Sequence, residues 1–285
     1  MLSGDKNEKV WVAPVQGVSV PLVETGKSTE PAPKGLTGGD QQQQAASIAI
    51  PTTLPKPGET IPSGGKPRIA IVIDDMGLNP ARSKRAIALP RPVTLSFLPY
   101  ASKTVELAKE ARAAGHEILL HLPMEPLGAE DPGPDALLTG LSPEEQRART
   151  IKALETFSGY SGVNNHMGSK FTESREGMDV VIGVLKEKGL FFFDSMTSPK
   201  SVAALAARGQ GVPFAKRDVF LDNTSSEAAI RAQLAKLEQI ARKNGQAVGI
   251  GHPNPVLVGA LEKWLTEAEK NGFLIVPLRD LVKSE

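Results

Sequence analysis

The 285-residue sequence contains no cysteine, so disulfide bonds, thiolate metal ligands and cysteine nucleophiles are all excluded. It has no apolar run of about 18 residues or more, so we expect no membrane span in this chain. Positive and negative side chains are nearly balanced, and the formal net charge is +1. No lysine and arginine cluster offers the basic face that nucleic acid binding requires, so we expect no nucleic acid partner.

Aromatic residues are scarce in the first 66 residues, where Trp11 stands alone among eight prolines and nine glycines. A Gln41–Gln44 run adds to this composition. Such a segment has too little apolar surface to offset its ordering entropy. We therefore expect residues 1–66 to form a disordered linker or tail and residues 67–285 to form the folded domain. The start of the chain lacks the apolar core of a signal peptide, which leaves open a cytosolic protein or a missing leader.

From Arg68 onward, strand and helix signals alternate. The continuous apolar run Ile69–Ile73 is typical of a strand buried on both faces. Ser142 and Glu145, with Pro143 between them, predict a helix start, and Thr224 with Glu227 predict another. The alternation predicts an α/β fold, a (β/α) barrel of about seven to eight strands.

Polar side chains recur just after the predicted strands. The carboxyl ends of parallel strands lie at one face of such a fold, where active sites are built, so these side chains should converge. They are Asp74, Asp75, His121, Glu125, Asn165, His166, Asp194, Ser195 and His252.

The residue types in this set indicate metal chemistry. The adjacent carboxylates of Asp74 and Asp75 repel each other and need a cation or a proton to coexist. A metal held by one of them, with the other acting as a base, would resolve that repulsion. His121 and Glu125 lie four residues apart in a proline-containing turn that could bring both to one ion, and their nitrogen and oxygen donors suit zinc.

Each residue also has an ordinary structural explanation. The two aspartates could cap the turn after their strand, and Glu125 could be a solvated loop residue. His166 could be a buried histidine satisfied by neighbouring amides, Asp194 could cap a helix, and His252 could cap a loop. No serine lies in a Gly-x-Ser-x-Gly motif, so we do not expect a serine hydrolase.

The ordered series of motifs resembles the polysaccharide deacetylase (NodB-homology) superfamily, and most closely its divergent polysaccharide deacetylase branch. The resemblance covers residues 67–285. It is carried by the segments 73–77 (Ile-Asp-Asp-Met-Gly), 121–126 (His-Leu-Pro-Met-Glu-Pro), 164–169 (Asn-Asn-His-Met-Gly-Ser), 193–195 (Phe-Asp-Ser) and 251–253 (Gly-His-Pro).

This resemblance implies a distorted (β/α) barrel and assigns roles to the motif residues. Asp74 would be the general base and His252 the general acid. Asp75 and His121 would be ligands of a divalent metal, which we expect to be zinc, with Glu125 or His166 completing the set. Asn165, Asp194 and Ser195 are the expected substrate contacts. Glu125 stands where the superfamily usually has a second metal histidine, which is a departure from its pattern.

The implied function is a metal-dependent hydrolase that removes acetyl groups from an N-acetylated polysaccharide or a peptidoglycan-type glycan. The resemblance also implies a periplasmic or cell-envelope location, with the cytoplasm as the alternative. Two other functions stay open. One is a non-catalytic envelope protein that uses the barrel to bind glycan or a partner, and the other is a metal hydrolase acting on a different amide or ester.

Overall fold

The computed structural model describes residues 65–90 and 92–283. The segment 1–66, expected to be disordered, lies almost wholly outside these described residues. Among the described residues no helix combines the length and the apolar character needed to cross a membrane.

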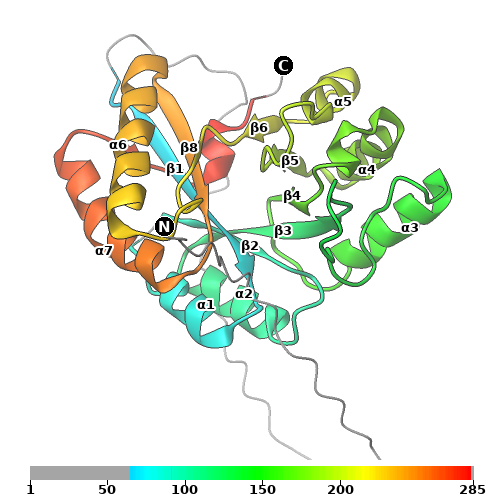
Figure 1. The fold of residues 1–285 in the computed structure, drawn as a ribbon, viewed down its shortest axis with the longest axis horizontal. Helices are drawn as coiled ribbons and strands as arrows, with labels where there is room; N and C mark the ends of the chain where they lie inside the picture. Colours follow the sequence, from blue (N-terminus) through cyan, green and yellow to red (C-terminus); the bar gives the residue numbers. More distant parts are fainter. Residues whose placement is uncertain (1–64, 91, 284–285) are drawn as a thin grey trace, which may run out of the picture. The chain divides into compact units, whose positions relative to one another are not determined.

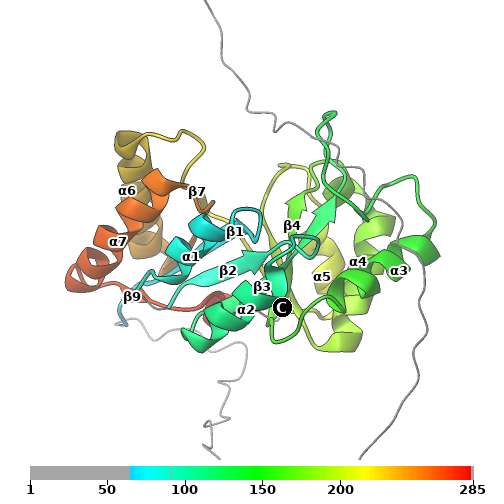
Figure 2. The same ribbon diagram turned by 90° about the horizontal axis from the view of Figure 1, so that it is seen from below.

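A parallel sheet forms the centre of the domain, and helices cover its outer side (Figures 1 and 2). The strands are β1 (Arg68–Met76), β2 (Thr94–Phe97), β3 (Glu117–Met124), β4 (Gly162–Met167), β5 (Phe191–Asp194), β6 (Phe214–Lys216), β7 (Val219–Phe220), β8 (Gln246–Gly251) and β9 (Leu274–Ile275). The α-helices are α1 (Pro80–Ile87), α2 (Thr104–Ala113), α3 (Pro143–Leu154), α4 (Arg175–Lys188), α5 (Ala203–Gln210), α6 (Glu227–Asn244) and α7 (Pro255–Lys270), and the 3-10 helices are η1 (Phe171–Glu173) and η2 (Leu278–Leu281).

The sheet curls into a half-barrel with the strand order β6-β5-β4-β3-β2-β1-β8-β7, while β9 pairs with β1. Its edge strands β6 and β7 are consecutive along the chain, and only Arg217 and Asp218 separate them. One continuous segment therefore crosses from one edge of the sheet to the other. The predicted α/β barrel-like fold is confirmed in this curled form.

The run Ile69–Ile73 explains why β1 lies at the centre. Ile69, Ile71 and Ile73 belong to the apolar cluster shared with the helices, whereas Ala70 and Val72 belong to a second cluster shared with the other strands. This separation follows the two-residue alternation of a strand. All five side chains are fully buried, so both faces of β1 are covered, as the sequence predicts.

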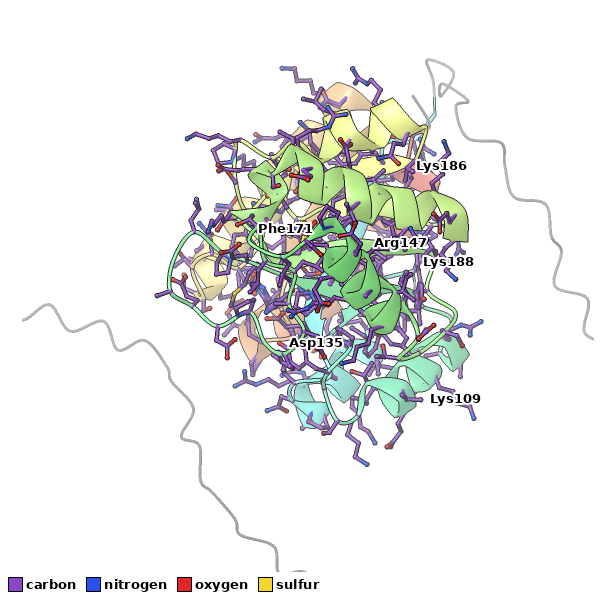
Figure 3. All side chains as sticks on the ribbon, turned by 90° about the vertical axis from the view of Figure 1, so that its right-hand side faces the viewer. Lys109, Asp135, Arg147, Phe171, Lys186 and Lys188 are labelled. Atoms are coloured by element: carbon purple, nitrogen blue, oxygen red, sulfur yellow. The ribbon has the colours of Figure 1, made fainter. Side chains whose placement is uncertain are left out.

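Helix starts follow the capping signals, with one difference. Ser142 caps α3 through a hydrogen bond from the Glu145 amide, as predicted. The start of α6 is capped by Ser226, which accepts from the Ala229 amide, and not by Thr224. Two serines follow Thr224, and the spacing rule alone does not choose among three adjacent hydroxyl residues. Figure 3 shows the outer face of α3 and α4, where labelled Arg147, Lys186 and Lys188 lie on the surface.

The C-terminal segment covers the end of the barrel at which the parallel strands begin, called here the amino end. Leu278 and Leu281 of η2 join the apolar cluster inside the sheet. Next to them Glu117 is buried and accepts hydrogen bonds from the Thr94 hydroxyl, the Ser161 hydroxyl and the Arg279 amide. The opposite end of the barrel carries the candidate site.

Candidate active site

Towards the carboxyl ends of the strands, the inward-facing positions change from apolar to polar. Because inward positions recur every second residue, each polar side chain follows an apolar one on the same strand or just past its end. These successions are Val72 to Asp74, Leu119 to His121, Phe193 to Ser195, and Ile250 to His252. The convergence expected from the sequence is therefore a direct result of strand register.

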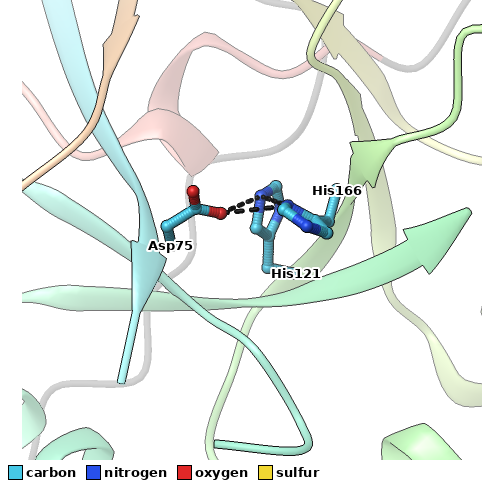
Figure 4. A group of neighbouring side chains, drawn as sticks. All are labelled: Asp75, His121 and His166. Carbon is cyan, nitrogen blue, oxygen red and sulfur yellow. Dashed lines mark hydrogen bonds and ion pairs between the residues drawn. The ribbon is translucent and has the colours of Figure 1, made fainter. Parts of the chain in front are cut away.

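Asp75, His121 and His166 form a group that could hold a metal ion, with one donor atom from each lying within 4.8 Å of the others. Asp75 Oδ1 lies 2.9 Å from His166 Nδ1 and 3.4 Å from His121 Nε2. The two imidazole nitrogens are 3.3 Å apart. Figure 4 shows the three side chains pointing toward one another from β1, β3 and β4.

Backbone geometry explains how Asp74 and Asp75 reach the same site although neighbouring residues in a strand face opposite sides. Asp75 has a φ of 55°, in the left-handed region that non-glycine residues rarely adopt. The pairing of β1 with β2 also shifts register between Ile73 and Met76. This local irregularity turns the Asp75 carboxylate back toward the interior, a strained arrangement of the kind found at functional sites.

The donor set fits a divalent cation. Asp75 Oδ1 is buried and has no directed hydrogen bond, although two imidazoles lie within ion-pair distance. Burial raises the pKa of the Asp75 carboxyl, but His121 and His166 outweigh this effect and hold the pKa well below its usual value. Two imidazoles and one carboxylate are ligands that zinc accepts.

Asp74 lies beside this group and is 4% exposed. Its Oδ1 accepts a hydrogen bond of 2.9 Å from the Asn164 amide, and its Oδ2 lies 3.6 Å from His121 Nε2. Burial raises the pKa of the Asp74 carboxyl, partly offset by the nearby His121 and His252. A carboxylate with a raised pKa is a better proton acceptor than one at the surface.

His252 faces the group from β8, with its Nε2 3.9 Å from Asp75 Oδ2. Its Nδ1 lies 3.2 Å from Asp222 Oδ1, and Asp222 Oδ2 accepts from the His252 amide. Burial lowers the pKa of His252, but the hydrogen bond to Asp222 and the charges of Asp75 and Asp74 outweigh it and raise the pKa to about 9. The imidazole is thus set to carry a proton at neutral pH.

Glu125 is placed apart from the metal-binding group. Its Oε2 accepts from the amide and hydroxyl of Thr139, and its Oε1 forms an ion pair of 2.7 Å with Lys170. The Glu125 amide also pairs with the carbonyl of Leu137. Glu125 therefore fastens the base of the loop that follows β3, while His166 occupies the third position near Asp75 and His121.

The three expected substrate contacts are placed differently from one another. The Ser195 hydroxyl accepts from the Asn164 amide, which also binds Asp74, so Ser195 borders the site. Asn165 binds the Ser195 amide, the Met167 carbonyl and the Thr197 hydroxyl, and so joins two loops. Asp194 accepts from the Met196 amide and from the Ser201 hydroxyl, and so holds the turn after β5.

Sequence reasoning missed two residues that the structure brings to the site. Asp222 follows β7, a two-residue strand too short to give a periodic signal. Asn164 precedes the predicted site residues Asn165 and His166. Because its side chain is an uncharged amide, its residue type alone does not predict a role in catalysis. Its place among inward-facing strand residues was the signal that could have identified it.

Comparisons with known proteins show the family of this chain. Residues 71–282 match the model of the divergent polysaccharide deacetylase family. The chain is 38% identical over 196 residues to the uncharacterized protein YibQ of Escherichia coli K12, and the match covers 69% of this chain and 61% of YibQ. It is 36% identical over 198 residues to an uncharacterized protein of Haemophilus influenzae, covering 70% of this chain and 71% of that protein. The match thus spans less than two thirds of the length of YibQ.

Two solved structures share the fold. The uncharacterized protein ATU2773 from Agrobacterium tumefaciens C58 has 34% sequence identity and a TM-score of 0.75, covering 78% of this chain and 92% of that one. A putative cellobiose-phosphate cleavage protein from Enterococcus faecalis V583 has a TM-score of 0.55 at 17% identity, covering 76% and 99%, which shows a shared fold alone. With the family match extending over most of the described residues, this chain belongs to the divergent polysaccharide deacetylase family.

Proposed function

We propose that this protein is a metal-dependent hydrolase that removes acetyl groups from an N-acetylated glycan by cleaving the amide C–N bond. The observation that carries the proposal is one arrangement: the Asp75, His121 and His166 group lies between a buried carboxylate, Asp74, and a proton-carrying imidazole, His252. Membership of the divergent polysaccharide deacetylase family supports a glycan as the substrate.

Asp75, His121 and His166 would hold a divalent cation, and zinc suits their mixed nitrogen and oxygen donors. When bound, such a cation supplies Lewis acidity that polarises a carbonyl oxygen and lowers the pKa of water. The left-handed backbone at Asp75 accompanies a carboxylate that lies close to both histidines, and Asp74 would stay free of the cation.

Asp74 would accept the proton of the attacking water, and His252 would donate a proton to the leaving amine. The Asn164 amide orients the Asp74 carboxylate, and Asp222 orients His252 by binding both its ring and its backbone amide. General acid and base groups of this kind each contribute typically ~10²–10⁴-fold to the rate.

We propose the periplasm or cell envelope as the place of action, because a peptidoglycan-type or other envelope glycan is the substrate class that the family resemblance implies. Fractionation of cells that express the full natural protein tests this location. Recovery in the cytoplasmic fraction alone would contradict it.

The function is tested by measuring zinc content and acetate release together on the full chain. Oligomers of N-acetylglucosamine, peptidoglycan fragments and a panel of simple amides and esters serve as substrates, with Asp75→Asn as the inactive control. Acetate release from a glycan that requires zinc supports the proposal. Zinc and glycan binding without any release would indicate the non-catalytic binding protein, and turnover confined to simple amides or esters would indicate a different hydrolase.

A further inference from the structure

Asn164 is the most highly connected side chain in the site. It is fully buried on β4 and contacts residues from four other strands or strand ends. Its Oδ1 accepts from the Ser96 hydroxyl on β2 and lies 3.1 Å from His121 Nδ1 on β3. Its Nδ2 donates to Asp74 Oδ1 on β1 and to the Ser195 hydroxyl after β5.

These four contacts use the complete hydrogen-bonding capacity of an amide side chain, which has two acceptor positions and two donor hydrogens. They also fix which way round the amide lies. An ionised Asp74 carboxylate only accepts, so the amide nitrogen must face it and the oxygen must face His121. The orientation of Asn164 is therefore determined by its partners.

The amide oxygen in turn determines the proton position on His121. An oxygen without a hydrogen can only accept, so Nδ1 of His121 must carry the proton in this contact. The lone pair of the neutral ring then lies on Nε2. That atom is the one that faces Asp75 Oδ1 at 3.4 Å and His166 Nδ1 at 3.3 Å.

We propose that Asn164 is a positioning residue that uses a single amide to select the metal-binding tautomer of His121 and to hold Asp74 in its orientation. The inference rests on the proposed function for the roles of Asp74 and of the cation. It adds a physical coupling between the base and the metal ligand, because the Asn164 amide sets both the orientation of Asp74 and the tautomer of His121. A histidine ligand whose second nitrogen donates to a fixed acceptor is the arrangement that stabilises metal sites, and loss of the acceptor typically weakens affinity ~10–100-fold.

Two substitutions separate the role of Asn164 toward His121 from its role toward Asp74. Asn164→Leu removes every hydrogen bond and should weaken zinc affinity by about 10–100-fold. Asn164→Asp keeps an acceptor for His121 but places a second carboxyl group beside Asp74, and two buried carboxyl groups at this distance share a proton. Zinc affinity should stay near the wild-type value, while acetate release falls at least ~10²-fold because the shared proton occupies the base. A purely structural role would not separate affinity from turnover in this way.

The tautomer is measured directly from the ¹⁵N shifts of His121 in the metal-free protein, at a pH where those shifts themselves show a neutral ring. The wild type and N164D should show the proton on Nδ1, whereas N164L should show a mixture of both tautomers. Ser161→Ala is the matched control, because it removes a partly buried hydrogen bond at the other end of the barrel. It should lower the melting temperature and leave zinc affinity and the tautomer unchanged.

Wild-type zinc affinity or an unchanged tautomer in N164L would overturn the role toward His121. Full turnover in N164D would overturn the role toward Asp74. If the leucine variant does not fold, Asn164→Ala provides the same two measurements. If the wild type releases no acetate from any glycan, the proposed function fails, while zinc affinity and the His121 tautomer still decide the role of Asn164.

Discussion

The two ends of the barrel each bury a carboxylate oxygen, but they satisfy it differently. At the amino end Glu117 accepts hydrogen bonds from two hydroxyls and one backbone amide, all from the protein. At the carboxyl end Asp75 Oδ1 is buried without a directed hydrogen bond, between two imidazole nitrogens. Burial raises the pKa of Glu117, whereas the imidazoles lower the pKa of Asp75.

The difference shows how a ligand site is distinguished from a structural polar cluster. Buried polar groups are normally satisfied by the protein or by ordered water, so a buried carboxylate oxygen that has no directed hydrogen bond and is flanked by two imidazoles is a position that could hold a cation. Substitutions of the site residues at the carboxyl end should therefore change ligand binding or catalysis. Substitutions at the amino end should change stability alone.

The largest effect is expected at Asp75. Asp75→Asn removes the negative charge but keeps a residue that tolerates the left-handed backbone. Zinc content should fall to background and acetate release should be lost, while the metal-free protein stays folded. Metal analysis and circular dichroism on the same sample check this. Full zinc content in the variant would remove Asp75 from the ligand set.

Asp74→Asn should separate catalysis from metal binding. Its neighbour Asp75 and the two histidines remain in place, so zinc content should be unchanged. The amide cannot accept the proton of water, so kcat should fall by about 10²–10⁴-fold. Loss of zinc together with activity would instead make Asp74 a ligand.

At the amino end Glu117→Ala should lower stability without changing zinc affinity. The substitution leaves the buried Thr94 hydroxyl without its acceptor, at a cost of about 1–3 kcal/mol, and removes the acceptor of the partly buried Ser161 hydroxyl. In a domain of this size each kcal/mol corresponds to about 2–4 °C in melting temperature. Because burial raises the folded-state pKa of Glu117, its ionisation opposes folding, so the contribution of Glu117 to stability should decrease as the pH rises above about 4.5. Altered zinc affinity in the variant would show that the two ends are coupled.

Asp222→Asn should lower the pKa of His252 in the metal-free protein from about 9 toward the ordinary value of about 6.5. The raised folded-state pKa means that the His252 and Asp222 pair stabilises the fold fully below about pH 6.5 and loses this effect as the pH rises through about 9. The stability difference between wild type and variant should shrink over that interval. An NMR titration of His252 checks the pKa, and an unchanged value would remove Asp222 as its cause.

The smallest effect is expected for Glu125→Gln. The variant keeps an acceptor for Thr139 but loses the ion pair with Lys170, and exposed ion pairs contribute about 0–1 kcal/mol. Zinc affinity should equal that of the wild type, measured by calorimetry beside Asp75→Asn. A clear loss of zinc would return Glu125 to the ligand set and weaken the contrast between loop anchor and ligand.

Much of the fold could be predicted because its signals are local. The run Ile69–Ile73 is apolar at every position, and the structure buries both of its faces. The cap at Ser142 lies within one helical turn of its partner. The cap of α6 could not be chosen, because Thr224 and the two serines after it offer the same hydroxyl, and only the chain path selects Ser226.

The sequence by itself determined that polar residues meet at one end of a parallel sheet, because strand alternation and the common direction of the strands are properties of the local chain. It could not determine which of them become partners. Glu125 is bound by Lys170, 45 residues away, and His252 by Asp222, 30 residues away. Such pairs depend on how distant segments are brought together, as the register of β3 against β4 does here. The group around Asp75 depends also on the left-handed backbone of that one residue. Only the tertiary structure therefore decided that His166 and not Glu125 completes the group with Asp75 and His121.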